Sequence, residues 1–138
     1  MLDRGTHTDK VKARAGEVGF EACAIAAAEP VDPEDRLGAW LLKGYHADMT
    51  WLAATKPVRR NVREKLPGAR SVVVVAKNYN GPQPNPPEGS IWGKVSRYAW
   101  GRDYHRVLHK PLESLAQFIA ELEPDGRCFC SMDSGPVL

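Results

Sequence analysis

Four consecutive valines at positions 72–75 constrain the fold more than any other feature of this 138-residue chain. A β-branched side chain is restricted at χ1 and packs well on a pleated surface, so the run favours extended backbone. The sequence therefore predicts a strand over residues 71–79. Because both of its faces are apolar, we expect a central strand of a sheet covered by helices.

Apolar and amphipathic segments alternate along the rest of the chain. We expect strands over residues 20–28 and 127–132, and helices over residues 9–17, 33–44 and 46–53, the last with Met49 and Leu52 pointing inward. The longest predicted helix covers 103–122, where apolar residues recur at spacings of three and four. Pro111 should kink this helix or mark the start of a second one. Residues 56–71 and 81–90 are rich in turn-forming residues. The pattern predicts an α/β (α+β) fold with a mixed sheet covered by helices.

Composition excludes several classes of protein. With 43% hydrophobic and 26% charged residues, the chain is an ordinary globular one, and we expect residues 1–138 to form a single domain. Its net charge of +2 is too small to attract nucleic acid in bulk, so only local clusters of cations could do so. No apolar run reaches the roughly 20 residues that span a bilayer, and the N-terminus lacks the apolar core of a secretory signal. Three cysteines do not form a disulfide framework, which favours reduced thiols in a cytoplasmic protein.

Residues 96–110 contain the densest group of chemically versatile side chains. Its candidate ligand-binding residues are Arg97, Tyr98, Asp103, Tyr104 and His105. Asp103 precedes a predicted helix and is first of all typical of an N-cap. The N–H groups of that first turn also favour an anionic or amide-rich ligand, so a binding site and a solvated helix start both fit. His105 and His109 are spaced as a helical metal pair, but no third ligand follows, and we expect no metal site.

Asp133 follows the predicted strand 127–132 and has small neighbours. A carboxyl group desolvated at a sheet edge has a raised pKa and can donate a proton near neutral pH. Alternatively, Asp133 caps a turn by accepting from the backbone of Gly135.

A basic segment could contact phosphates or form a solvated face. Its members are Lys56, Arg59, Arg60, Arg63, Lys65 and Arg70, joined by Lys94, Arg97, Arg102 and Arg106.

Together these segments resemble one family, epoxyqueuosine reductase, a cobalamin-dependent iron–sulfur enzyme of tRNA modification. The resemblance lies in GFEACAIA, GYHADMTWL, RNVREKLPGARSVVVVAKNY, SRYAWGRDYHRVLHKPLESL and SMDSGPVL, in that order over nearly the whole chain. The most specific piece is R-Y-A-x-G-R-D-Y-H at residues 97–105. The match covers the family's N-terminal, cobalamin-binding part, which is similar to a nitroreductase-like α/β sandwich.

The resemblance implies a concrete reaction, in which the epoxide of epoxyqueuosine in tRNA is reduced to the alkene of queuosine. Two [4Fe–4S] clusters deliver the electrons to cobalamin in this family. Asp133 corresponds to the family's catalytic acid, in its D-[ST]-G motif. The D-Y-H at residues 103–105 corresponds to the lining of the corrin and substrate pocket, and Arg97 and Tyr98 lie beside it.

The departures from the family's pattern concern the clusters. None of the three cysteines has the C-x₂-C-x₂-C-x₃-C spacing of cluster ligands. We therefore expect an N-terminal part whose C-terminal cluster domain is absent and which is not a competent reductase by itself. Two other functions stay open: a module that binds cobalamin or tRNA without turnover, and part of a related cobalamin-dependent enzyme such as a reductive dehalogenase.

Overall fold

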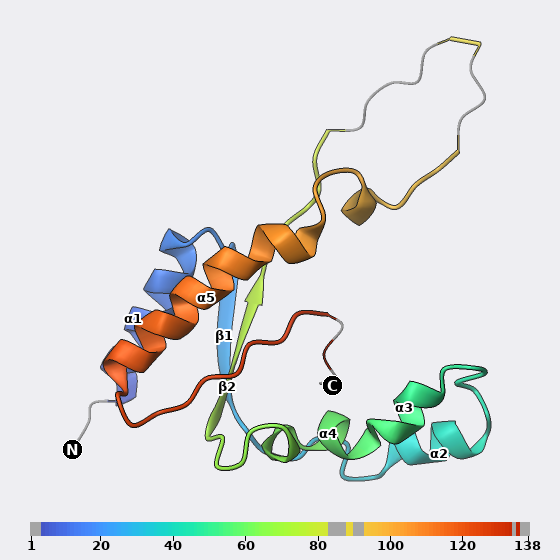
Figure 1. Ribbon diagram of the computed structural model, residues 1–138, viewed down its shortest axis with the longest axis horizontal. Helices are drawn as coiled ribbons and strands as arrows, with labels where there is room; N and C mark the ends of the chain where they lie inside the picture. The colour runs from blue at the N-terminus through green and yellow to red at the C-terminus, as the bar shows by residue number, and fades with distance from the viewer. Residues whose placement is uncertain (1–3, 83–87, 90–92, 134, 136–138) are drawn as a thin grey trace. The chain divides into compact units, whose positions relative to one another are not determined.

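The computed structural model describes residues 4–82, 88–89, 93–133 and 135 (Figure 1). Its elements are α1 (Arg4–Glu17), β1 (Ala22–Ala27), α2 (Arg36–Leu42), α3 (Thr50–Ala54), α4 (Lys56–Arg60), η1 (Val62–Glu64), β2 (Ser71–Ala76), η2 (Arg97–Ala99) and α5 (Tyr104–Leu122). This mixture of helices and a small sheet confirms the predicted fold class. Over the described ranges, no helix combines the length and apolar character needed to cross a bilayer.

The chain gathers into two compact units. Unit 1 comprises Met1–Ala24 and Val75–Cys130, and unit 2 comprises Ile25–Val74 and Ser131–Leu138. The expectation of a single domain over residues 1–138 stays a prediction. Five of the candidate site residues belong to unit 1, and Asp133 belongs to unit 2.

Unit 1 is built on the antiparallel pair of helices α1 and α5, which lie side by side in Figure 1. Val11 and Ala15 of α1 and Leu115 of α5 are buried. Two polar contacts join the helices: Arg14 Nη2 donates to Ser114 Oγ at 3.1 Å, and His7 Nδ1 lies 3.3 Å from Glu123 Oε1. Because α1 is short of apolar residues, these few contacts fix how α5 is held.

Helix α5 forms where its sequence pattern predicts. Asp103 is its N-cap, and its apolar residues lie on one side at helical spacing. Pro111 lies inside α5, which is a single element, so the alternative of a second helix starting there is wrong. A proline in a helix lacks the N–H that would bond to the carbonyl four residues earlier. Helix α5 nevertheless continues on both sides of Pro111.

The sheet of the described residues consists of β1 and β2. The amide of Glu21 donates to the carbonyl of Ala76, and that of Ala28 to the carbonyl of Arg70, both at 3.0 Å, so the strands are antiparallel. The strand predicted at the valine run is confirmed but ends at Ala76. The expectation of a covered central strand is wrong for this part of the chain, because β2 has one neighbour and Val74 is 56% exposed.

The strand predicted over residues 127–132 is also wrong, since no strand is assigned there. A strand requires a hydrogen-bonded neighbour as well as suitable side chains, and the apolar residues of this segment supply only the second requirement. The sequence pattern could not reveal whether a partner strand exists.

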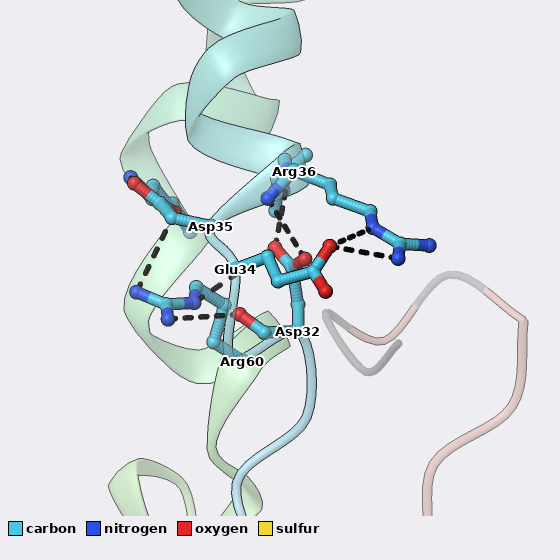
Figure 2. Close-up of polar contacts among 7 residues, drawn as sticks. Asp32, Glu34, Asp35, Arg36 and Arg60 are labelled. Atoms are coloured by element: carbon cyan, nitrogen blue, oxygen red, sulfur yellow. Dashed lines mark hydrogen bonds and ion pairs between the residues drawn. The ribbon is translucent and has the colours of Figure 1, made fainter.

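Unit 2 places α2 later than predicted (Figure 2). The carboxylate of Asp32 accepts from the amides of Arg36 at 2.8 Å and Leu37 at 2.9 Å, so the helix begins at Arg36 and not at Pro33. The backbone bond from Leu37 is the main cause that lowers the pKa of Asp32. Asp32 therefore does serve the start of α2, as expected, but across an intervening turn.

The basic segment after residue 55 is less irregular than predicted. It contains the short helix α4 and the 3₁₀ turn η1, because Pro57 in the first turn of α4 loses no helical hydrogen bond. The short helix predicted over residues 46–53 appears as α3. Met49 does not point into a core there and is exposed, since no described element covers it.

We predict that Leu115→Ala destabilises the chain by about 2–4 kcal/mol, because Leu115 is 3% exposed and its truncation leaves a cavity against α1. Val107→Ala on the same helix is the matched control, since Val107 is exposed and its loss should change the free energy of unfolding by less than about 0.5 kcal/mol. Urea unfolding followed by circular dichroism measures both. Equal losses would show that α1 and α5 do not form the core of unit 1.

Candidate functional site

The start of α5 positions the predicted D-Y-H residues. Asp103 Oδ1 accepts from the backbone amide of His105 and lies within 2.9 Å of both this nitrogen and the ring Nδ1 of His105. The bond to the imidazole is the main cause that lowers the pKa of Asp103, and the backbone bond adds to it. Asp103 is thus an N-cap, as the simpler interpretation holds, and it also orients the neighbouring imidazole.

The contact with Asp103 engages one of the two ring nitrogens of His105. When Nδ1 donates its hydrogen to a carboxylate, the Nε2 of a neutral imidazole is an acceptor. The rings of His105 and Tyr104 stack, with centroids 4.2 Å apart and planes inclined by 29°. The pair therefore presents a flat aromatic surface, in which the Nδ1 of His105 is engaged by Asp103.

Tyr98 extends this aromatic group. Its ring meets that of Tyr104 edge to face, with centroids 6.2 Å apart, and it is 56% exposed. The short helix η2 places Arg97 beside it, with the guanidinium 5.7 Å from the centroid of Trp100. Trp100 Nε1 in turn donates to the carbonyl of Val95 at 2.8 Å, which fixes the indole. The structure thus brings Tyr98, Tyr104, His105 and Asp103 together, with Arg97 next to Tyr98 in sequence.

Trp100 is a member of this site that the prediction did not select as a ligand-binding residue. It stands at the variable position of the R-Y-A-x-G-R-D-Y-H motif, so the resemblance carried no signal for it. Its three-residue spacing from Arg97 could have indicated the contact, because such neighbours meet on a helical turn.

Asp133 lies in a turn of unit 2. The residue is exposed, and its backbone is in the left-handed region with φ of 37°. The amide of Gly135 donates to the carbonyl of Met132 at 3.2 Å, so a backbone bond closes this turn. A non-glycine residue in this region is uncommon and marks a position under local constraint. The role of Asp133 as an acid stays a prediction.

The cysteines are separate from this site. Cys128 and Cys130 are exposed overall, yet local desolvation raises the pKa of both thiols, and it also raises the pKa of Cys23. Within the described ranges, no group of three or more His, Cys, Asp or Glu residues could hold a metal ion.

Unit 2 also contains an open hollow of about 460 Å³ that sequence reasoning did not find. It lies between Pro30 and Val31 on one side and Lys56, Pro57 and Arg60 of α4 on the other. None of the six predicted site residues lines it. Only the folding of the 30–35 loop against α4 creates the hollow, and a linear sequence gives no signal for that approach.

A family model decides what this geometry belongs to. The model described as epoxyqueuosine reductase QueG, DUF1730, matches residues 59–134, more than half of the chain. The chain belongs to the epoxyqueuosine reductase family. An epoxyqueuosine reductase of Gloeobacter violaceus is 45% identical over 130 residues, which are 93% of this chain and 40% of the relative. That of Escherichia coli K12 is 35% identical over 142 residues, covering 99% of this chain and 37% of the relative.

Solved structures agree with this assignment. A crystal structure of selenomethionine-labelled epoxyqueuosine reductase superposes with a TM-score of 0.82 at 25% identity, covering 97% of this chain and 36% of that chain. An epoxyqueuosine reductase with an epoxyqueuosine-modified tRNA-Tyr stem loop has the same fold, with a TM-score of 0.79 at 24% identity, and the coverage is again 97% and 36%. The chain therefore spans about 40% of the length of the family members it matches.

We predict that the stability given by Asp103 depends on pH. Its folded pKa is lowered, so its contribution is present above the unfolded value of about 4 and is lost as the pH falls through the lower folded pKa. Asp103→Asn removes the charge, so the thermal midpoints of the two proteins should differ at pH 7 and converge toward pH 3.

The variant His105→Ala tests the cause of this effect. It keeps the backbone bond to Asp103 but loses the imidazole bond, so the Asp103→Asn difference should shrink in this background. A thermal midpoint that changes with pH identically in wild type and Asp103→Asn would contradict the assignment.

Proposed function

We propose that this chain supplies the cobalamin- and substrate-binding part of an epoxyqueuosine reductase, which reduces the epoxide of epoxyqueuosine in tRNA to queuosine in the cytoplasm. The observation that carries the proposal is the family match over residues 59–134, because all six candidate residues fall inside it. The electrons would come from iron–sulfur clusters bound outside these 138 residues, since the three cysteines lack cluster spacing.

The residues at the start of α5 fit cobalamin in their chemistry. A corrin has a broad, largely apolar face and a periphery of amide groups, and the stacked pair Tyr104–His105 with the exposed ring of Tyr98 offers matching aromatic surface. The guanidinium of Arg97 is a donor suited to amide or phosphate oxygens. When bound, cobalamin would supply the strongly reducing centre that epoxide cleavage needs. In this proposal, the chain's own task is to hold the macrocycle and the substrate.

Asp133 is proposed as the proton donor. Reduction of an epoxide to an alkene takes up two electrons and two protons and releases the oxygen as water. Opening the ring places negative charge on that oxygen, so a carboxyl group within hydrogen-bond reach lowers the barrier by about 10²–10⁴-fold in rate. Asp133 must be protonated to act in this way, which requires that bound substrate or cofactor remove water from a residue that is exposed in the chain alone.

The cluster-bearing chemistry does not fit this chain. Within the part of the chain that the structure describes, no group of three or more His, Cys, Asp or Glu residues, Cys128 and Cys130 included, could hold a metal ion. The two residues are also separated by a single position. No electron-transfer step is therefore assigned to the cysteines of this chain.

The proposed reaction is tested by combining this chain with the unmatched part of the Gloeobacter violaceus relative in a bacterial strain that lacks its own reductase. We predict that queuosine appears in tRNA, measured by mass spectrometry of nucleosides. Asp133→Asn should slow its formation by about 10²–10⁴-fold and leave epoxyqueuosine in its place.

Asp125→Asn is the matched control, because Asp125 is an exposed aspartate in the turn after α5 and lies outside the family's D-[ST]-G motif. It should leave queuosine formation unchanged. Failure of the wild-type chain to restore queuosine would refute the proposed function, and full activity of Asp133→Asn would refute the role of the acid alone and favour an enzyme that uses another donor.

Cofactor binding gives a readout that does not depend on turnover. We predict that Tyr104→Ala weakens cobalamin binding by the 138-residue chain by about 2- to 12-fold, the range for loss of one aromatic contact. The visible spectrum of added cobalamin measures the affinity. Tyr79→Ala is the control, since Tyr79 is an exposed tyrosine of unit 1 outside the site. Equal effects of both variants would remove Tyr104 from the proposed cofactor surface.

A further inference from the structure

An exposed aromatic ring in unit 2 has a cation held over it. Trp51, in α3, is 53% exposed, and the guanidinium of Arg59, in α4, lies 5.2 Å from the centre of its ring. Thr55 links the two residues: its hydroxyl donates to the carbonyl of Trp51 at 2.7 Å and accepts from Arg59 Nε at 3.0 Å. Thr55 lies between the two short helices, four residues from each of the other two, so its hydroxyl bridges Trp51 and Arg59. The Arg59 guanidinium is therefore fixed in place before any partner arrives.

The charge of Arg59 is not used by the acidic loop of unit 2, defined here as residues 29–35. Between residues 36 and 74 the chain has eight Lys and Arg residues against two Asp and Glu. The acidic loop forms ion pairs with four of these cations, some of them visible in Figure 2. They are Arg36, Lys56, Arg60 and Arg63. Arg59 takes no part in these pairs and keeps its charge beside an exposed ring.

The same unit contains a second pair of this kind. The ammonium of Lys43 lies 5.8 Å from the ring centre of Tyr45, which is 61% exposed. Trp40 meets the Tyr45 ring nearly at right angles, with centroids 6.4 Å apart, and so restrains it. Two of the cations that the acidic loop leaves unpaired thus lie over exposed rings. A surface that served only solubility would need the charges but not the rings.

We propose that the Trp51–Arg59 pair is an RNA contact, in which the indole stacks on an unpaired base and the guanidinium binds the adjoining phosphate. Every base has a π-face, and an aromatic ring beside a cation is the arrangement by which proteins hold single-stranded nucleic acid. Arg binds a phosphate with two parallel hydrogen bonds when its planar group is pre-oriented, as the Thr55 contact provides. This inference rests on the proposed function and names where its tRNA partner meets unit 2.

The test measures binding of a fluorescein-labelled tRNA anticodon stem-loop to the 138-residue chain by fluorescence anisotropy. Trp51→Ala should weaken binding by about 5- to 150-fold, whereas Trp51→Phe, which keeps a ring, should retain most of the affinity. Arg59→Gln should reduce the slope of log affinity against log salt by about 1, the loss of one phosphate contact.

The control is Arg36→Gln, because Arg36 is more exposed than Arg59 but is paired with Glu34. It should leave both the affinity and the salt slope unchanged. A fully paired RNA duplex of equal length serves as the second probe, and Trp51→Ala should have little effect on its binding. Circular dichroism of each variant checks that it is folded.

Three results would overturn the inference: no binding of the stem-loop by the wild-type chain, equal losses for Arg36→Gln and Arg59→Gln, or an equal effect of Trp51→Ala on duplex and loop. Each leaves the queuosine assay unaffected as a test of the proposed function. Conversely, the wild-type chain could fail to restore queuosine while Trp51→Ala still weakens stem-loop binding. That result would support the RNA contact and refute the reductase role.

Discussion

The packing of α1 against α5 is the contact on which the candidate cofactor site depends. Val11, Ala15 and Leu115 are among the few buried residues of the described chain, and α5 carries Tyr104 and His105 in its first turn. A helix stabilised at its centre by tertiary packing can present its N-terminus as a fixed surface. The aromatic group thus owes its geometry to a small apolar contact that lies away from it along α5.

Asp103 couples this scaffold to the proposed chemistry. One carboxylate oxygen caps the helix and binds the imidazole of His105, so the same residue starts the helix and orients the neighbouring ring. The simpler interpretation, a capping aspartate, is therefore confirmed, and a role of Asp103 in ligand binding stays a prediction. The ring of the neighbouring residue, Tyr104, stacks on the oriented imidazole of His105.

The net charge of the chain does not show which cations of unit 2 are paired with carboxylates and which are not. A net charge of +2 gives no reason to expect an RNA partner. The 29–35 loop nevertheless neutralises selected cations of the basic segment, and Arg59 remains over Trp51. The arrangement of cations, and not their number, supports the proposed contact, and the same loop shapes the hollow beside α4.

The sequence by itself determined the local elements and the family. The valine run, the N-cap at Asp103 and the helical spacing of residues 104–122 are short-range signals, and they appear in the structure as β2 and α5. Pairing and burial were decided only by the tertiary structure. Residues 127–132 have the pattern of a strand but no assigned strand, and Met49 and Val74 are exposed. Helix α2 begins at Arg36 because the side chain of Asp32 accepts from the amide of Arg36 across a turn. Local backbone preference acts over a few residues, whereas a strand partner or a covered face depends on which segments meet in space.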